Sequence, residues 1–302
     1  MLRIRRAEEA IGEMCETGEV RCPCHLSIGQ EAVAAGVSAA LLPGDTVWGA
    51  HRSHGHYLAQ GGSLESLFAE VLGKTTGCSG GRGGSMHLTA PEQGLPGTVP
   101  IVAGTIPLAA GAALAYKLRG EKRVAVAFFG DGALEEGSVH ETLNLAALYK
   151  LPLIFVCENN LYSSHLHWTE RRVADNLDQA GAFHSVPCAR VDGNAVEDVF
   201  EAARQAVGRA RSGAGPSFLE CRTFRWRGHV GASSDQDVGV HRRGELAEWL
   251  EYDPIQRAAE KLNMDLATHC ADVDQEIDRA LTNARSASAP DAGRIGEHVC
   301  AS

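Results

Sequence analysis

The sequence predicts an α/β protein in which helices cover both faces of a parallel sheet. Three short apolar runs have the continuity of buried parallel strands: Arg123–Phe129, Leu153–Cys157 and Ser217–Cys221. Between the first two, Ser138–Lys150 carries apolar residues at near-helical spacing. This alternation of strand and helix implies crossover connections, and crossovers produce a parallel sheet.

The remaining elements follow from the same patterns. Asp45–Trp48 is a shorter strand candidate. The N-terminal segment MLRIRRAEEAIGEMCE predicts an amphipathic helix, and further helices are expected at Gly29–Leu41, Leu64–Leu72, Pro107–Leu118, Ala195–Arg211 and Asp272–Ala287. Gly77–Gly84 and Arg227–Asp237 are too rich in small and polar residues for core elements and predict loops. With no repeat and no clear boundary, we expect residues 1–302 to form one domain with helical extensions at both ends.

Composition excludes several classes of protein. The 302 residues include 28 basic and 38 acidic side chains, a formal charge of −10, which argues against binding to nucleic acid or to an acidic membrane surface. The stretch from Gln93 to Tyr116 has no charge and is long enough to cross a bilayer, but repeated Gly and Pro interrupt it. We therefore expect neither a nucleic-acid partner nor a membrane partner.

Nine scattered cysteines indicate reduced thiols in a cytoplasmic compartment. Cys22-Pro-Cys24-His25 is the one cluster that resembles a metal site. It lacks the second pair of ligands that a structural zinc site needs, so zinc is not predicted there.

Two polar motifs predict a functional site. Gly130-Asp131-Gly132 directly follows the first apolar run, and Asn159-Asn160 follows the second. A crossover places these strands near each other, so Asp131 and Asn160 would lie at adjoining carboxyl ends, where open α/β sheets bind ligands. Both side chains offer hard oxygen ligands that suit Mg²⁺, and the helix after Gly132 directs N–H groups toward an anion. Although a simple strand-to-helix turn also favours Gly and Asp, the pair together predicts a Mg²⁺–diphosphate site.

The motifs also resemble a known family. GDGALEEG at 130–137 followed by Asn159-Asn160 resembles the thiamine diphosphate signature. The surrounding text resembles the alpha subunit of the decarboxylating component of 2-oxo acid dehydrogenases. Its matching blocks are CHLSIGQEAV at 24–33, HRSHGH at 51–56, GKTTGCSGGRGGSMHL at 73–88, IPLAAGAALA at 106–115, LPLIFVCENNLY at 151–162, RGHVG at 227–231 and HRRGELAEW further on. The resemblance implies a thiamine diphosphate-binding fold in which this subunit carries the diphosphate-binding half.

The resemblance assigns roles to individual positions. Asp131, Asn160 and the backbone carbonyl of Tyr162 match the Mg²⁺ ligands. The other implied positions surround the cofactor: Gly132 and Ala133 at the diphosphate, Arg52 at the phosphate, Val102 under the bent cofactor, and His25 and His229 as catalytic histidines that face the cofactor and its substrate.

Three positions depart from the family pattern. His51 stands where many relatives have Tyr before the phosphate-binding arginine, and it resembles acetoin-type members. Pro100 stands where Gly is frequent near the aminopyrimidine; proline keeps the carbonyl acceptor but has no N–H. Thr105 replaces a frequent Gln. Because Pro100 and Thr105 are expected near the reacting end, they leave the substrate open.

The resemblance implies an enzyme that requires a partner. The family's beta subunit supplies the pyrimidine-binding domain and an activating glutamate, in an α₂β₂ assembly. The implied reaction is decarboxylation of a pyruvate-like 2-oxo acid, or cleavage of acetoin, with transfer to a lipoyl carrier such as an acyltransferase. Two alternatives stay open: an acyloin synthase or transketolase-like two-subunit enzyme, and a non-catalytic regulatory or assembly subunit on the same fold.

Overall fold

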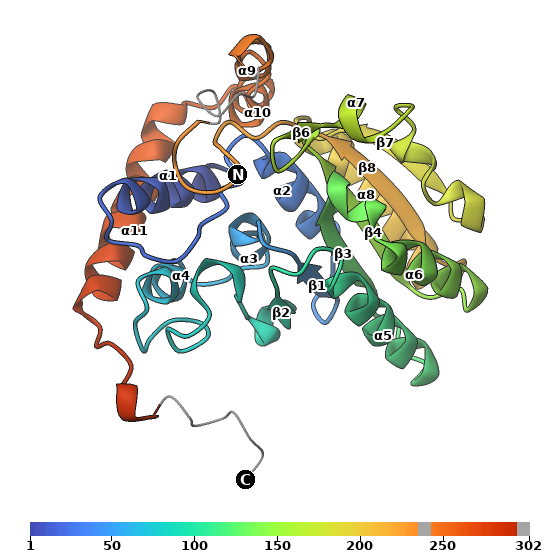
Figure 1. Ribbon diagram of the computed structural model, residues 1–302, viewed down its shortest axis with the longest axis horizontal. Coiled ribbons are helices and arrows are strands. Elements are labelled where there is room, and N and C mark those ends of the chain that lie inside the picture. The colour runs from blue at the N-terminus through green and yellow to red at the C-terminus, as the bar shows by residue number, and fades with distance from the viewer. Residues whose placement is uncertain (235–242, 295–302) are drawn as a thin grey trace.

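The computed structural model describes residues 1–234 and 243–294, and its centre is a parallel six-stranded sheet (Figure 1). The strand order is β2-β1-β3-β4-β8-β7, and every neighbouring pair is parallel. The strands are β1 (Thr46–Gly49), β2 (Gly97–Thr98), β3 (Ala125–Gly130), β4 (Leu153–Asn159), β7 (Cys188–Asp192) and β8 (Ser217–Arg222). The predicted α/β class with a parallel sheet is therefore confirmed.

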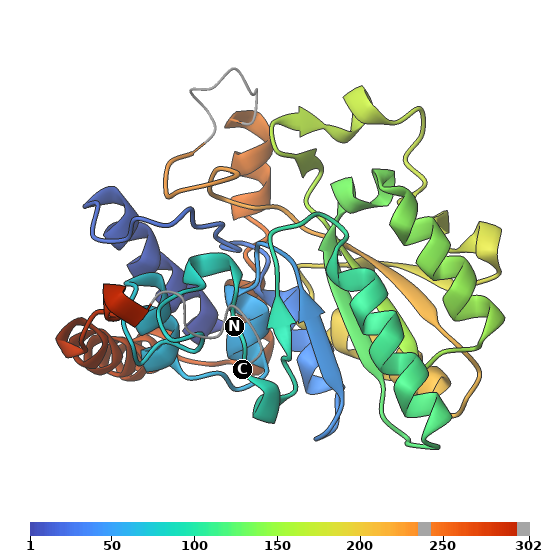
Figure 2. The same cartoon turned by 60° about the horizontal axis from the view of Figure 1, so that its bottom comes forward.

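Side chains alternate across the sheet and fill two separate cores. Phe128, Ile154 and Val156 point to one face, where α2 (Glu31–Ala39) and α8 (Val196–Arg211) pack. Phe129 and Phe155 point to the other face and contact α5 (Thr105–Leu118) and α6 (Gly137–Leu148). Figure 2 shows α5 and α6, in green, on one side of the strands and the blue N-terminal helices on the other. Helices on both faces, as predicted, explain why these strands are apolar throughout.

Further elements surround this sandwich. Long helices from the two ends of the chain lie side by side, because α1 (Leu2–Glu16) contacts α11 (Leu266–Ser286) and Arg6 pairs with Asp274 at 2.7 Å. The other elements are the helices α3 (His54–Ala59), α4 (Leu64–Val71), α7 (Trp168–Arg171), α9 (Arg243–Leu250) and α10 (Pro254–Leu262), and the hairpin of β5 (Tyr162–Ser163) with β6 (Leu166–His167). Among the described residues, no helix is long and apolar enough to span a bilayer.

Most predicted elements are found within a few residues of the expected bounds, and the exceptions have physical causes. Strand β7 was not predicted, because it lies at the sheet edge and most of its residues, among them Arg190 and Asp192, are exposed. Helix α5 begins at Thr105, before Pro107, because proline is accepted in the first turn of a helix. Helix α11 begins at Leu266, before Asp272, because the Asp265 side chain accepts a hydrogen bond from Ala267 N and caps the helix.

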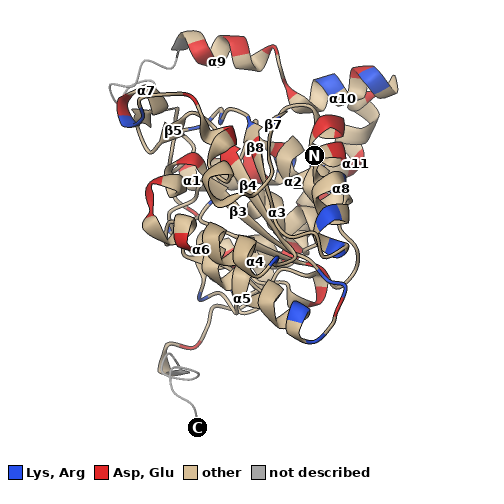
Figure 3. Ribbon diagram, turned by 90° about the vertical axis from the view of Figure 1, so that its right-hand side faces the viewer, with Lys and Arg blue, Asp and Glu red and all other residues tan. Residues whose placement is uncertain are grey.

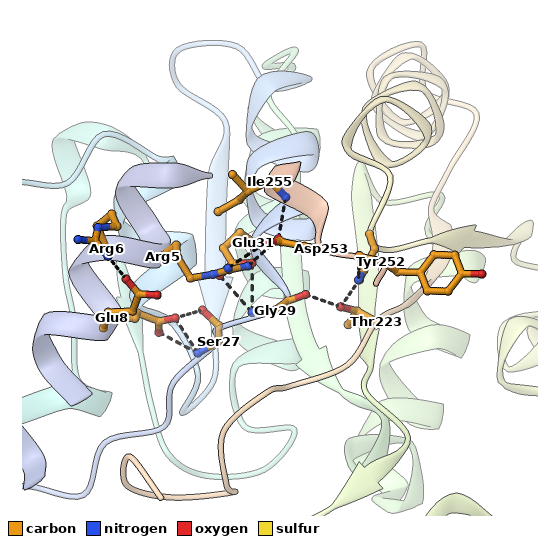
Figure 4. Close-up of polar contacts among 12 residues, drawn as sticks. Arg5, Arg6, Glu8, Ser27, Gly29, Glu31, Thr223, Tyr252, Asp253 and Ile255 are labelled. Atoms are coloured by element: carbon orange, nitrogen blue, oxygen red, sulfur yellow. Dashed lines mark hydrogen bonds and ion pairs between the residues drawn. The ribbon is translucent and has the colours of Figure 1, made fainter. Parts of the chain in front are cut away.

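Buried acids clamp the irregular segment between α1 and α2 (Figure 4). The Glu8 carboxylate accepts hydrogen bonds from Ser27 N and Oγ at 2.8 Å. The Glu31 carboxylate accepts from Gly29 N at 3.1 Å and from Arg5, which also reaches Asp253 at the start of α10. Burial raises the pKa of Glu31, and the Arg5 guanidinium opposes that rise. The segment that carries His25 is therefore fixed from three helices.

A second buried acid organises the glycine-rich loop at 77–84. The Glu70 carboxylate is fully buried and accepts four backbone hydrogen bonds of 2.6 to 3.1 Å, from Ser79, Gly81, Gly83 and Gly84. A Cβ atom at Gly81 would lie 2.5 Å from the Lys74 carbonyl oxygen, so a side chain there would collide with backbone. The loop thus needs its glycines to close around Glu70.

Candidate cofactor site at the carboxyl edge of the sheet

The two predicted motifs meet at one edge of the sheet. Strands β3 and β4 are adjacent, and Gly130 is in register with Glu158, so Asp131 and Asn160 follow the ends of neighbouring strands. Both side chains are buried, and both line a cavity of about 280 Å³. Asp131 opens a 3₁₀ turn, Asp131–Glu135, that leads into α6. The placement predicted from the two motifs is therefore confirmed.

The same cavity collects residues from distant parts of the chain. Its lining includes all eleven positions predicted to surround the cofactor: His25, His51, Arg52, Pro100, Val102, Asp131, Gly132, Ala133, Asn160, Tyr162 and His229. Thr105 is different. It is buried in the first turn of α5 and is not part of the lining, so its expected position near the reacting end is not supported. His241 and Arg242, from another matched block, lie outside the described residues.

Two arginines that sequence reasoning missed contact Asp131. The Arg171 guanidinium, at the end of α7, forms ion pairs with the Asp131 and Glu135 carboxylates. Arg172 Nη2 donates to the Asp131 carbonyl oxygen at 2.7 Å. Burial raises the pKa of the Asp131 carboxyl, and the positive charge of Arg171 acts in the opposite direction. The carboxylate thus faces a cation in this structure, as a metal ligand would.

Gln30 is a further residue that the sequence did not single out. Asn160 Nδ2 donates to Gln30 Oε1 at 3.0 Å, while Asn160 Oδ1 accepts from Tyr162 N at 3.3 Å. Gln30 is 1% exposed and lines the cavity, and its Nε2 has no hydrogen-bond partner. This side chain holds the Asn160 amide and keeps an unused donor group at a residue of the lining. Only its place in GQEA, one residue before α2, could have suggested it.

Arg52 joins the two loops that carry histidines. Its Nη1 donates to the Leu26 carbonyl oxygen at 2.5 Å, and its Nη2 donates to the His229 carbonyl oxygen at 3.2 Å. The Arg52 side chain is buried at the cavity. In the sequence, Arg52 directly precedes Ser53, the residue before α3. Arg52 therefore fixes the backbone on both sides of the cavity as well as lining it.

His25, His51 and His229 form a triangle at the cavity wall. Their ring centroids are 4.7, 5.0 and 5.6 Å apart, and one nitrogen from each ring lies within 4.8 Å of the others. Burial, helped by the nearby positive charge of Arg52, lowers the pKa of His25 from 6.5 to about 3 and that of His51 to about 2. At neutral pH these two rings are uncharged, so each has one N–H donor and one acceptor.

This burial predicts acid sensitivity. The unfolded chain protonates His25 near pH 6.5, whereas the folded chain protonates it near pH 3, so the unfolded state binds more protons between these values. The free energy of unfolding should therefore fall as the pH drops below about 6.5. Each such histidine contributes a slope of up to about 1.4 kcal/mol per pH unit.

Urea denaturation of the cofactor-free chain at pH 6.5 and pH 5.0 measures the effect. Wild type should lose up to about 2 kcal/mol more over this interval than His25→Asn, which has no ring to protonate. Equal losses would show that His25 is not held neutral in the folded protein.

A histidine–glutamate pair completes the inner wall. His56, on α3, stacks on Phe128 with 4.0 Å between ring centroids, and its Nε2 lies 3.2 Å from Glu158 Oε2. Both His56 and Glu158 line the cavity. Nearby, His54 bonds to Glu8 at 3.1 Å and to Ser85 at 2.8 Å, which holds the turn that carries Met86 into the lining.

The chemistry of the lining suits an anion held with a hard cation. A carboxylate and an amide carbonyl supply oxygen ligands at Asp131 and Asn160, and buried donors without partners face the same space at Gln30 Nε2 and, depending on its tautomer, His25 Nδ1. A Cβ atom at Gly132 would lie 2.4 Å from Ser163 Oγ, so a side chain there would require Ser163 to move. The residues present therefore fit a diphosphate with a divalent metal.

Comparison with known proteins identifies the family. The family model for the dehydrogenase E1 component matches residues 1–292. The chain belongs to the dehydrogenase E1 component family. The family resemblance noted in the sequence is thereby confirmed, and membership makes this chain part of a thiamine diphosphate-dependent oxidoreductase that uses a divalent metal, generally Mg²⁺.

Curated relatives of this E1 chain cover most of its length. The alpha subunit of acetoin:2,6-dichlorophenolindophenol oxidoreductase from Bacillus subtilis is 39% identical over 95% of this chain and 86% of its own. The pyruvate dehydrogenase E1 alpha subunit from Rhizobium meliloti is 41% identical over 87% of this chain and 75% of its own. The human somatic form of that subunit is 35% identical over 100% of this chain and 78% of its own.

Proposed function

We propose that this E1 chain is the alpha subunit of a two-subunit enzyme that decarboxylates a pyruvate-like 2-oxo acid or cleaves acetoin, with transfer of the product to a lipoyl carrier. The observation that carries the proposal is the meeting of Asp131, Asn160 and Arg52 in one cavity. Relatives named for acetoin and for pyruvate resemble this chain to a similar degree, so both substrates belong to the proposal.

Asp131, Asn160 and the Tyr162 carbonyl would hold Mg²⁺. The Tyr162 hydroxyl donates to Glu245 Oε2 at 2.5 Å, which anchors this residue between the sheet edge and α9. Gly132, Ala133, Arg52 and His51 would bind the phosphates, through backbone N–H groups, a guanidinium and a neutral ring. Pro100 offers a carbonyl acceptor, and Val102 offers an apolar support at the same wall. The chemistry that thiamine diphosphate supplies when bound is attack on a carbonyl carbon and storage of the released electron pair.

His25 and His229 are the proposed catalytic residues. Their rings are 5.0 Å apart, on two segments that Arg52 joins, so they can face one substrate together. The pKa of His25, lowered to about 3, keeps this ring neutral near pH 7, so it can donate or accept a hydrogen bond at a reacting oxygen.

An exposed apolar surface supports the proposed beta subunit. Leu108 and Leu118 on α5, and Leu148 on α6, are at least half exposed, and Ile101 beside the cavity is 68% exposed. The ribbons of α5 and α6 are almost entirely free of charged residues (Figure 3). Patches of this kind mark protein interfaces. Exposed Val102, which follows Ile101 and lines the cavity, connects this surface to the site, so a partner here could supply the pyrimidine-binding domain of the proposed α₂β₂ assembly.

The surroundings of the site support two smaller proposals. We infer one diphosphate-binding domain from residue 1 to 302, because α1 and α11 pack together beside the sheet. We infer a reducing, cytoplasmic location, because all eight cysteines among the described residues are free thiols, as the sequence predicted.

A substrate screen tests the main proposal. The chain is co-expressed with its beta partner, and 2-oxo acids and acetoin are supplied with an artificial electron acceptor. Turnover of pyruvate or acetoin supports the dehydrogenase. Formation of an acyloin without reduction of the acceptor would indicate the synthase alternative. If the pair neither reacts nor binds the cofactor tightly, the chain is an assembly subunit.

Arg52→Lys should weaken cofactor binding. Lysine cannot reproduce the planar fork that reaches the Leu26 and His229 carbonyl oxygens and still presents a donor to phosphate. The expected cost is roughly 1–3 kcal/mol, about 5- to 150-fold in Kd for thiamine diphosphate with Mg²⁺. Isothermal calorimetry measures it, with Arg119→Lys, an exposed arginine on the C-terminal side of α5, as the matched control. Equal affinities for Arg52→Lys and wild type would remove Arg52 from the phosphate site.

Gln30→Glu should weaken binding of Mg²⁺ with inorganic pyrophosphate. The carboxylate can still accept from Asn160, but it loses the free donor and places negative charge beside the anion. We expect about a tenfold increase in Kd at pH 7.5 and partial recovery at lower pH, where a protonated Glu regains a donor. A purely structural role would give a loss that does not change with pH.

A further inference from the structure

We propose that Cys22 and Cys24 are a reactive dithiol that reacts with small anionic disulfides and closes to an intramolecular disulfide. The two Sγ atoms are 4.0 Å apart in an irregular segment between α1 and α2. A spacing of two residues keeps the Cα atoms within about 7 Å, near the upper limit for a disulfide. Rotation of the side chains and a small bend of the backbone would bring the sulfur atoms to bonding distance.

Cys22 is the accessible member of the pair. It is half-buried and lines a second cavity, of about 720 Å³, which shares no lining residue with the cofactor cavity. Cys24 is 1% exposed and lies behind it. A small disulfide would therefore meet Cys22 first, and Cys24 would act second.

The second cavity favours anionic reagents. Its lining has four cationic side chains (Arg21, Lys74, Arg82 and Arg285) and two acidic ones (Glu19 and Glu70). Both acids are already engaged, since Glu19 pairs with Arg285 at 2.8 Å and Glu70 accepts the backbone N–H groups of the glycine-rich loop. The remaining positive charge suits a carboxylate-bearing disulfide of the glutathione type.

The surroundings of the thiols support this order of reaction. Hydrogen bonding from Cys24 lowers the pKa of Cys22 to about 6, although its partial burial acts against the change. Hydrogen bonds with the Cys15 and Cys22 thiols, together with burial, raise the pKa of Cys24. A low thiol pKa at an accessible position is the usual mark of an attacking cysteine.

The proposed reaction has two thiol–disulfide exchanges. The Cys22 thiolate attacks one sulfur of the small disulfide, and one small thiolate leaves and takes up the proton released by Cys22. The Cys24 thiol then loses its proton and attacks the Cys22 sulfur, and the second small thiol leaves. The protein loses two electrons and two protons, and the small disulfide is reduced to two thiols.

Closure would reach the cofactor site through the backbone. His25 directly follows Cys24, and the Cys24 carbonyl oxygen accepts a hydrogen bond from Gly231 N at 2.8 Å, two residues after His229. Bending at Cys24 would therefore disturb both proposed catalytic histidines. This consequence rests on the proposed function, whereas the thiol chemistry does not.

Mass spectrometry tests the thiol chemistry directly. The full-length chain is incubated with glutathione disulfide and digested with trypsin, which releases residues 22–52 as a peptide whose only cysteines are Cys22 and Cys24, while Cys15 falls in the preceding peptide. We expect the 22–52 peptide to lose the mass of two hydrogen atoms as the disulfide forms. The rate of this loss should be at least about tenfold higher than the rate at which half-buried Cys78 is modified. Cys24→Ser should instead accumulate one glutathionyl group on Cys22.

Two results would overturn the dithiol: an unmodified 22–52 peptide while Cys78 reacts, or a cross-link that joins the Cys15 peptide to it. Cys15 is the relevant competitor because it also forms a hydrogen bond with Cys24.

Calorimetry tests the link to the cofactor site. The oxidised chain should bind thiamine diphosphate with Mg²⁺ at least tenfold more weakly than the reduced chain, and a reductant should restore the affinity. Equal affinities would overturn the link. A reduced chain that binds no cofactor, even with its beta partner, would contradict the proposed function and leave the mass-spectrometric result standing.

Discussion

Asp131→Ala is expected to abolish Mg²⁺-dependent binding of thiamine diphosphate. Asp131 supplies the one anionic ligand among the proposed metal ligands, and neither alanine nor a water molecule restores a charged oxygen at that position. Loss of a charged ligand in a buried site should cost at least about 3 kcal/mol, or more than a hundredfold in Kd.

The fold should survive this change. Arg171 would lose its partner at Asp131 but would keep its ion pair with Glu135, which is 41% exposed and can follow it. Asp131→Asn is the matched variant, because it retains the shape and one oxygen but not the charge. Circular dichroism should be unchanged in both variants, and calorimetry should rank wild type above Asn and Asn above Ala. Undiminished affinity in Asp131→Ala would remove the metal from this carboxylate.

The second large effect concerns the chain by itself. The isolated chain should show no turnover of pyruvate or acetoin, and addition of the beta partner should restore it. In the proposed assembly this chain binds the phosphates, while the activating glutamate belongs to the partner. Without the partner, the reacting ring would be held only from its phosphate end, and lost orientation can raise a barrier by roughly 7–11 kcal/mol.

Substitutions on the exposed apolar surface allow assembly with the partner to be weakened in the full chain. Leu108→Glu and Leu148→Glu place charges on the exposed apolar surface without entering the core, so the isolated chain should remain as stable as wild type. Assembly with the beta subunit, followed by size-exclusion chromatography, should fail or weaken, and activity should fall with it. Glu141→Gln, on an exposed turn of α6, is the control. Full activity from the purified chain without a partner would contradict the two-subunit proposal.

The site divides into a part that was predictable from local sequence and a part that was not. Asp131 and Asn160 could be predicted together, because strand ends and crossover rules place them at one edge of the sheet. The positions of His25, Arg52 and His229 came only from family resemblance, since the bonds that join them span up to 177 residues and no periodicity encodes such contacts.

The missed residues share a physical reason. Gln30 and Arg171 have ordinary sequence surroundings, and their roles depend on which side chain lies opposite in the folded chain. The same limit applies to β7, whose exposed edge position removes the apolar run that marks the central strands. Local pattern specified the layers, and tertiary packing decided which polar groups face each other.

Glu70 affects which part of this protein is able to bind phosphate. A run of glycines with converging backbone N–H groups is the arrangement that many proteins use as a phosphate cradle. Here the protein's own carboxylate fills that cradle through four hydrogen bonds. The glycine-rich loop is therefore occupied by the protein's own side chain, and a search for nucleotide-type loops would choose this loop in place of the sheet edge. Diphosphate recognition is left to the sheet edge, so a Glu70→Gln chain would have a loosened loop and no new affinity for nucleotides.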